Sequence, residues 1–251
     1  MIHLISYGNN RFKNSKVRLK KEAENTNWFD SINIYGPEDL DEDFKEDFKE
    51  VLNKSRGGGY YIWRINVILK KLKEINDEDI LIFIDVGCKI NKPGEERFKE
   101  YINMLKDSEL GIISFQLHNN RSERNWTTKE IFNYFNVDIN SDMAINNQYI
   151  GGILIMKKNQ HLKKILDLTL KTYYDNPLLI TDHYNKNSQL KCFKDNRHDQ
   201  SIFSLIRKIH GSIVISDETR YRHKKKRMSS LDRQICRLKW KYPFWAARIR
   251  N

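Results

Sequence analysis

The residues best suited to chemistry in this sequence are gathered in three short polar motifs. The first, Asp85-Val86-Gly87, directly follows the apolar run Ile80–Ile84. A carboxylate at the end of a buried strand can hold a metal ion or a ribose hydroxyl group, whereas an acid in this place often does no more than close a strand before a turn. The tripeptide alone gives these two interpretations equal weight.

The second motif is a glycine run, Arg56-Gly57-Gly58-Gly59, at the start of a predicted helix. Glycine lets the backbone approach a ligand closely, and the amides that begin a helix suit phosphate. Arg64 lies further along the same helical pattern, so Arg56 and Arg64 could face one anionic group, or either could extend along the surface to water. A glycine triplet is also common in ordinary flexible loops.

The third motif, Arg197-His198-Asp199-Gln200-Ser201, opens a helix with an apolar stripe. Asp199 could act as a general base toward a hydroxyl group, or it could simply stabilise the amides at a helix start. The seven histidines include no pair four residues apart, so a zinc site is not expected. Neither a Gly-x-Ser-x-Gly motif nor a Walker-type loop is present.

Alternating strand and helix patterns position these motifs. Strands are predicted at Ile2–Tyr7, Ser31–Tyr35, Ile80–Ile84, 111–115, 149–156 and 213–215, and helices at 12–24, 38–52, 56–75, 95–105, 127–135 and after 199. This order predicts an α/β fold with a mixed, mostly parallel central sheet flanked by helices. Ligands bind such sheets at the carboxyl ends of the strands, where Asp85 is expected.

Composition indicates a single core followed by a basic tail. A chain of 251 residues with 39% apolar residues can bury one sizeable core. Residues 220–251 hold 12 of the 45 Lys and Arg residues but only one of the 33 acids, Asp232, so residues 1–219 are nearly neutral. We therefore expect one α/β domain over 1–219 and a basic, aromatic-rich helical tail over 220–251.

The tail mixes cations with aromatic residues such as Trp240, Phe244 and Trp245. This mixture suits an anionic membrane surface, where each cation adds about 1 kcal/mol, and it would place the protein on the inner face of the membrane. A helical arm that packs on the body ranks second and a nucleic-acid arm third. No apolar run is long enough to span a membrane, and three scattered cysteines fit a reducing cytoplasm.

Three stretches, in this order and spacing, resemble a family of bacterial surface-polysaccharide glycosyltransferases. They are Arg56–Arg64, Asp79–Cys88 and Arg197–Ser204, and the resemblance extends from the first strand to about Glu218. It implies a GT-A fold, which is Rossmann-like, and a donor cleft over the strand ends. It also implies a nucleotide-diphosphate sugar as donor, with UDP favoured, and a saccharide or lipid-linked saccharide of capsule or lipooligosaccharide synthesis as acceptor.

The resemblance also implies roles for individual residues. Asp199 is the implied catalytic residue, and Asp85 is the implied metal ligand. Residues implied to bind the donor are Ser6, Tyr7, Arg11, Arg56, Tyr60, Trp63, Arg64, Asp85 and Gly87. Residues implied to line the sugar and acceptor pocket are Gln148, Gly151, Gly152, His198 and Gln200.

One departure from the family concerns the metal ion. GT-A enzymes usually carry Asp-x-Asp, and here the third position is Gly87. Either Asp85 holds a divalent ion with a second ligand elsewhere, or Arg56 and Arg64 neutralise the leaving diphosphate without one. Oxygen ligands and a phosphate partner favour Mn²⁺ or Mg²⁺, and we expect such an ion at Asp85.

Two other functions fit parts of the sequence. A sugar nucleotidyltransferase needs the same α/β nucleotide cleft, but it would also need a glycine-rich loop with a lysine after the first strand, which is not found. A basic nucleic-acid-binding protein would use the tail, yet it would leave the near-neutral body and its polar motifs without a role.

Overall fold

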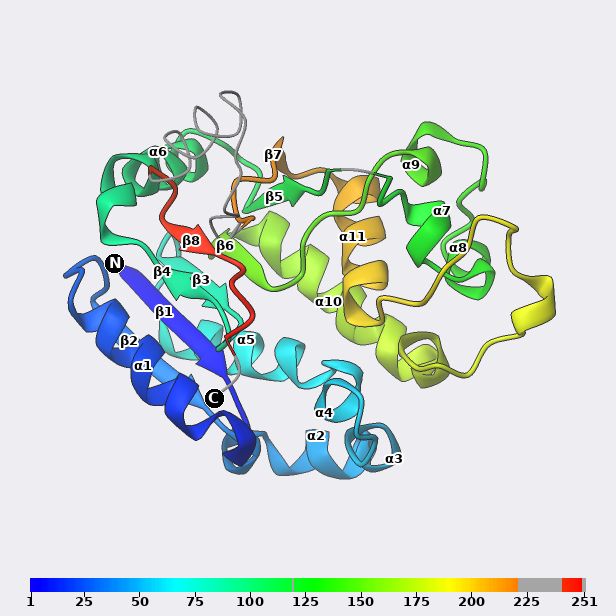
Figure 1. Cartoon of the computed structure of the whole chain (residues 1–251), viewed down its shortest axis with the longest axis horizontal. Coiled ribbons are helices and arrows are strands. Elements are labelled where there is room, and N and C mark those ends of the chain that lie inside the picture. Colours follow the sequence, from blue (N-terminus) through cyan, green and yellow to red (C-terminus); the bar gives the residue numbers. More distant parts are fainter. Residues whose placement is uncertain (119, 221–240, 250–251) are drawn as a thin grey trace, which may run out of the picture.

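A computed structural model describes residues 1–118, 120–220 and 241–249 (Figure 1). Its centre is a six-stranded sheet in the order β2-β1-β3-β6-β5-β7. The strands are β1 (Ile2–Tyr7), β2 (Ser31–Tyr35), β3 (Ile80–Ile84), β5 (Ile112–Gln116), β6 (Ile153–Lys157) and β7 (Ile213–Ser216). β6 runs antiparallel to both neighbours, and the other pairs are parallel, so the predicted mixed, mostly parallel sheet is confirmed.

Helices cover both faces of the sheet. Alternate side chains of β1 and β3, such as Leu4 and Ile82, pack in one core with α1 (Lys13–Glu24) and α6 (Glu95–Lys106). The intervening side chains, such as Ile5 and Phe83, pack in a second core with α5, α10 and α11. These three helices span Trp63–Glu74, Gln160–Asp175 and Asp199–His210. All five residues of β3 are buried, as a central strand requires.

Shorter elements surround this frame. The short helices are η1 (Asn10–Phe12), η2 (Pro37–Asp39), α2 (Glu42–Asp47), α3 (Lys49–Leu52), α4 (Gly57–Tyr60), η3 (Lys92–Gly94), α7 (Glu123–Trp126), α8 (Lys129–Tyr134), α9 (Asp142–Ile145), η4 (Pro177–Ile180) and η5 (Lys186–Ser188). In Figure 1, α7, α8 and α9 lie together beyond α11, on the side of the molecule away from α1. They form a lobe on the later half of the sheet.

The first three strands begin and end where the sequence predicts, but several helices do not. The predicted helix 38–52 is divided by Phe48, which ends α2 and begins α3 with non-helical dihedrals (φ −111°, ψ 22°). The glycine run does not open the long helix, because Gly57, Gly58 and Gly59 all have positive φ and α5 begins only at Trp63. The strand predicted at 149–156 pairs regularly only from Ile153.

The end of the chain returns to the body. β8 (Phe244–Trp245) pairs antiparallel with β4 (Lys89–Ile90). Phe244 is 1% exposed, and its ring lies 6.0 Å from that of Phe98. This part of the predicted tail packs on the body, because apolar side chains gain more by burial in the core than by exposure. Residues 221–240, including Trp240, lie outside the described part.

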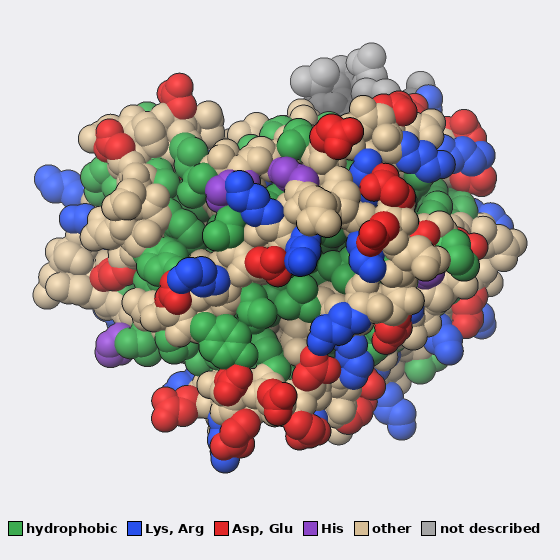
Figure 2. Space-filling model, turned by 180° about the vertical axis from the view of Figure 1, so that it is seen from behind, with side chains coloured by type: hydrophobic (Ala, Val, Ile, Leu, Met, Phe, Trp, Pro, Cys, Tyr) green, Lys and Arg blue, Asp and Glu red, His purple; other side chains and the backbone are tan. Residues whose placement is uncertain are grey.

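Charges are mixed on the surface seen from behind (Figure 2). Acidic side chains gather along the lower edge of this view, over α2 and α3, which carry several Asp and Glu residues. Elsewhere on this face Lys and Arg lie among acids. Among the described residues, no helix is both long and apolar enough for a membrane span.

Candidate active site

An arginine joins the carboxylates of two predicted motifs. Asp85 follows β3, Asp199 begins α11, and Arg64 lies in the first turn of α5. Arg64 donates from Nη2 to Asp85 Oδ1 at 3.0 Å and forms an ion pair through Nη1 with Asp199. Asp85, Arg64 and Asp199 therefore meet at the carboxyl edge of the sheet, although they lie far apart in the sequence.

The members of this chain of charges differ in exposure. The side chains of Arg64 and Asp199 are each 8% exposed, whereas that of Asp85 is 40% exposed. The guanidinium also lies 5.2 Å from the ring centroid of Phe83, inside the second core. A buried ion pair is stable only when its geometry and hydrogen bonds are complete, so Arg64 and Asp199 hold each other in one position. Asp85 is the most exposed of the three side chains.

Gly151 and Gly152 lie beside Asp85 and are called the glycine wall below. Asp85 donates its amide to Gly152 O at 2.8 Å, which places the start of β6 beside the end of β3. A Cβ on Gly152 would lie 2.4 Å from Asp85 Oδ2, so only glycine leaves this carboxylate in place. Gly151 donates its amide to Gln200 Oε1 at 3.1 Å, and Gln200 donates to Gln148 Oε1 at 2.9 Å. Hydrogen bonds thus connect the predicted Gln148, Gly151 and Gln200 beside Gly152, although Gln148 is only 1% exposed.

Arg56 lies in a different cluster from Arg64. It forms ion pairs with Asp182 (3.0 Å) and with Asp195. These carboxylates come from the irregular segment between α10 and α11, where no residue pattern predicts a site. Arg56 and Arg64 are thus each paired with two acids of their own, and their approach to one anionic group stays a prediction.

His198 is held in an uncommon conformation beside this cluster. Its φ of 56° and ψ of −123° are costly for a residue with a side chain, and such strain is found where the surroundings fix a functional geometry. The ring is 2% exposed, packs 4.7 Å from the ring of Tyr60, and hydrogen-bonds through Nδ1 to Ile180 O at 2.9 Å. Burial, followed by the charge of Arg56, lowers the pKa of His198 to about 4, so the ring is neutral at pH 7.

The residues predicted near the nucleotide are only partly on the surface. Tyr7 and Trp63 stack at 4.0 Å between ring centroids and are both buried. Ser6 is fully buried, so its side chain is not on the surface that a donor would meet. Arg11 is exposed in η1. The glycine run lies close to the end of β1, because a Cβ on Gly58 would be 4.0 Å from Asn9 Nδ2.

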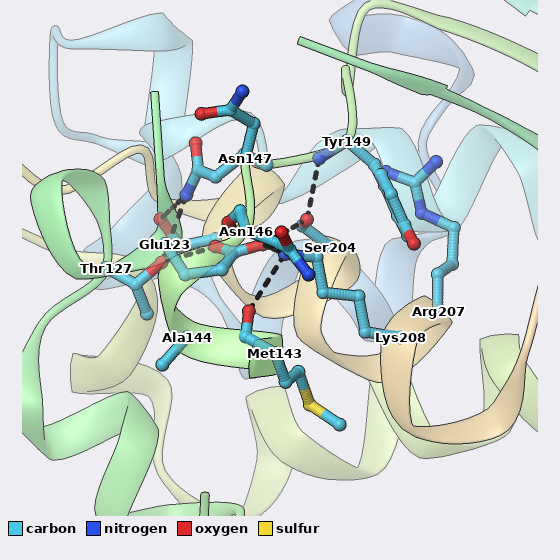
Figure 3. A network of polar contacts seen from close by, with 12 residues as sticks. Glu123, Thr127, Met143, Ala144, Asn146, Asn147, Tyr149, Ser204, Arg207 and Lys208 are labelled. Carbon is cyan, nitrogen blue, oxygen red and sulfur yellow. Dashed lines mark hydrogen bonds and ion pairs between the residues drawn. The ribbon is translucent and has the colours of Figure 1, made fainter. Parts of the chain in front are cut away.

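A buried polar network supports the glycine wall from the lobe side (Figure 3). Glu123 is fully buried; it accepts from Thr127 Oγ1 at 2.8 Å and pairs with Lys208 Nζ at 3.1 Å. Ser204 donates to the same carboxylate and accepts from the amide of Tyr149 at 2.8 Å. The network ties α7 and α11 to the segment that leads into Gly151. Sequence reasoning missed Glu123, because a lone acid in a short polar stretch gives no signal.

The surroundings of Asp85 do not fit a divalent ion held by the protein. In the ranges 1–118, 120–220 and 241–249, no three His, Cys, Asp or Glu side chains are grouped so that they could hold a metal ion. Gly87 offers no side chain, and the guanidinium of Arg64 lies between the carboxylates of Asp85 and Asp199. A cation placed between these two acids would be repelled by Arg64.

A pocket of about 800 Å³ lies at the opposite edge of the sheet. It is lined by the start of α10, part of α5 and loop residues such as Asp77 and Lys158. None of the predicted site residues lines it. The candidate active site is therefore the strand-end surface around Asp85.

Comparison with known proteins gives structural matches only. No family model matches the sequence, and no curated protein matches it. WbbM, a bifunctional glycosyltransferase, is similar with a TM-score of 0.51 and 9% identity over 97% of this chain and 45% of WbbM, so the chain spans less than half of that protein.

Two further matches are weaker. A glycosyltransferase involved in glycosylation of the major capsid of PBCV-1 has a TM-score of 0.48 and 12% identity over 87% of this chain and 83% of that one. The galactosyltransferase LgtC, solved with donor and acceptor sugar analogues, has a TM-score of 0.45 and 11% identity over 96% of this chain and 83% of LgtC. The sheet and the match to WbbM show that this chain has the fold of the GT-A glycosyltransferases.

Proposed function

We propose that this protein is a glycosyltransferase that moves a sugar from a nucleoside-diphosphate sugar to a hydroxyl group of a saccharide. The observation that carries the proposal is the meeting of Asp85, Arg64 and Asp199 at the carboxyl edge of a GT-A sheet, beside Gly151 and Gly152. Ligands bind α/β sheets at this edge. A strand end that served only to close a turn would not need a buried arginine shared with a second carboxylate.

Each side chain has a proposed task in the reaction. The exposed carboxylate of Asp85 accepts hydrogen bonds from donor hydroxyl groups, and Arg64 fixes its direction. Gln200 and the glycine wall leave room for the sugar ring. Asp199 is the proposed base, which takes the proton of the acceptor hydroxyl as its oxygen bonds to the anomeric carbon. The bond between that carbon and the phosphate oxygen breaks, and the nucleoside diphosphate leaves with the electron pair.

The donor, acceptor and place of action are further parts of the proposal. A UDP-type donor and a saccharide or lipid-linked saccharide acceptor of capsule or lipooligosaccharide synthesis are supported by the three-motif resemblance. Docking on the anionic inner face of the cell membrane is supported by the basic composition of 220–251. Because Phe244 and Trp245 are buried, any such docking would depend on the cations of the segment and not on these two aromatic rings.

Two measurements test the transferase. Thermal unfolding with UDP, GDP, CMP and representative nucleotide sugars should show a stability gain for one nucleoside diphosphate, because a ligand of the folded state raises its stability. With the donor so identified, Asp85→Asn should lower sugar transfer by at least about 100-fold without unfolding the protein. Asp77→Asn is the matched control, because Asp77 lies just before the first residue of β3, at the end away from Asp85, and its side chain is 84% exposed. Full transfer by Asp85→Asn would refute the site.

The membrane proposal needs its own assay. Wild-type protein should sediment with vesicles that contain anionic lipid and remain in the supernatant with neutral vesicles. Salt should release it, because exposed charges more than about 10 Å apart are screened at 0.1 M ionic strength. Equal binding to both kinds of vesicle, or to neither, would contradict an electrostatic membrane attachment.

A further inference from the structure

The C-terminal segment 241–249 lies along the loop that carries Asp85. In Figure 1 this segment, drawn in red, begins beside α6, includes β8 and ends near the start of α1. Backbone hydrogen bonds hold it at both ends: the amide of Asn91 donates to Pro243 O at 2.8 Å, and that of Ile249 donates to Gly87 O at 2.9 Å. Between them, Ala246 donates to Thr219 O at 2.7 Å. The segment therefore has a fixed course over the site.

Gly87 lies directly against the backbone of this segment. A Cβ at position 87 would lie 3.2 Å from Ile249 O and 3.5 Å from Arg248 Cα. A larger side chain such as aspartate would meet the backbone of the segment. GT-A enzymes usually carry a second carboxylate at this position. This chain has Gly87 there, and the backbone of Arg248 lies against it.

Arg248 is one of three arginines gathered here. It has a positive φ of 56°, an uncommon conformation that the neighbouring hydrogen bonds to Gly87 and Trp245 fix. Arg197, just before α11, stacks on Trp126 at 3.9 Å. Arg121 is tied to the same region, because its amide donates to Asn147 Oδ1 at 2.9 Å and its carbonyl accepts from Gln148.

Arg121 and Arg248 both act electrostatically on Arg197. The pKa of Arg197 is lowered, first by burial and then by the positive charges of Arg121 and Arg248. In the described parts of the chain, no acid forms an ion pair with any of the three; Asp195, the acid whose charge acts on Arg197, is itself paired with Arg56. Arg56 and Arg64, by contrast, do have acidic partners. An anion bound beside Arg197 would offset these positive charges.

We propose that Arg121, Arg197 and Arg248 bind the diphosphate of the donor and supply the charge that a metal ion gives in other GT-A enzymes. The inference rests on the proposed function, and it specifies how the leaving group is stabilised. Arginine suits this role, because its planar guanidinium can bind phosphate oxygens with two parallel hydrogen bonds. Preorganised positive charge at a leaving diphosphate lowers the barrier to its departure. The C-terminal segment is then part of the active site, since it carries Arg248.

Binding of UDP, GDP and inorganic pyrophosphate to the full chain tests this site, with EDTA present and then with Mn²⁺. Calorimetry should show that Arg197→Gln and Arg248→Gln each weaken binding by roughly 10- to 100-fold, the usual loss for a charge-assisted hydrogen bond. Lys241→Gln is the matched control, because Lys241 is exposed at the other end of the same segment. Thermal unfolding without ligand should show that all three variants are folded.

The outcomes separate the inference from the proposed function. If a nucleoside diphosphate binds wild type and both arginine variants equally, or binds only with Mn²⁺, the arginine site is refuted while the transferase stands. If pyrophosphate binds through the arginines but no nucleoside diphosphate does, the transferase is refuted and the anion site stands. If pyrophosphate binds without competing with the nucleotide, the arginines serve a phosphate of the acceptor and not the donor. Absence of all binding would overturn both.

Discussion

Adding one methyl group at Gly152 should disable the site without disturbing the fold. The backbone of Gly152 does not have the positive φ that excludes alanine, but a Cβ there would lie 2.4 Å from Asp85 Oδ2. Carbon and oxygen atoms approach to about 3.3 Å, so the carboxylate must move by roughly 1 Å. A displacement of about 1 Å in an active site can cost about 100-fold in rate, which corresponds to about 2.7 kcal/mol.

The stability of Gly152→Ala should change little. Rotation of Asp85 breaks its hydrogen bond with Arg64, but the Asp85 side chain is 40% exposed, so water screens the loss to about 1 kcal/mol or less. Replacing glycine by alanine at a compatible backbone position stabilises a protein by about 0.4–1 kcal/mol, which offsets this loss. The melting temperature should therefore shift by no more than about 2–4 °C.

Steady-state kinetics with the donor selected by thermal unfolding tests this reasoning in a double-mutant cycle. Gly152→Ala should lower kcat/KM by about 100-fold in the wild-type background. In an Asp85→Ala background, the same change should have almost no further effect, because the oxygen that the methyl group displaces is no longer there. A second 100-fold loss in that background would mean that Gly152 acts through the backbone or the sugar. Full activity of Gly152→Ala would mean that the position of Asp85 does not matter.

Three other changes test the parts that hold the site. Between pH 6.5 and pH 4 an unfolded histidine binds a proton that folded His198, with a pKa of about 4, does not, so up to about 3 kcal/mol of stability should be lost as the pH falls through this range. In urea unfolding, His198→Gln should lose less stability than wild type between pH 7 and pH 4.5. An equal loss in the two proteins would contradict a neutral His198 ring. Lys208→Met leaves Glu123 buried without its cation and should cost about 3–5 kcal/mol, whereas Glu123→Gln with Lys208→Met should recover part of this; no recovery would argue against the pair. Phe244→Ala should cost about 3–5 kcal/mol in chemical unfolding, and a loss below about 1 kcal/mol would mean that the end of the chain is not part of the core.

The sequence predicts the frame of the molecule better than its contacts. β1, β2 and β3 could be located to the residue, because continuous apolar runs between polar turns leave few alternatives. The nearness of Asp85 to the glycine wall is harder to predict from local sequence, because it depends on the pairing of Ile84 with Ile153 across β3 and β6. The resemblance assigned Gly152 to the pocket, but nothing in the sequence shows that Asp85 is its neighbour.

Ion pairs were the least predictable feature. Arg56 and Arg64 lie eight residues apart and looked equivalent, yet α5 begins only at Trp63, so the two arginines are on separate elements. The acids that hold Arg56 come from the irregular segment before α11, where no periodicity marks a position. The choice of partner depends on tertiary packing, and a pattern of residue types along the chain does not contain that information.

The arrangement of positive charge changes how the missing second aspartate is understood. From the sequence, Gly87 looked like the loss of a metal ligand, with Arg56 and Arg64 as the available replacements. In the folded chain both of these arginines already have acidic partners, whereas Arg121, Arg197 and Arg248 have none within the described residues. Gly87 and Arg248 are neighbours, and a Cβ at position 87 would press on the backbone of Ile249. A substitution of Gly87 by Asp would therefore displace Arg248 and should weaken diphosphate binding in EDTA, even though it restores the usual metal-binding pattern.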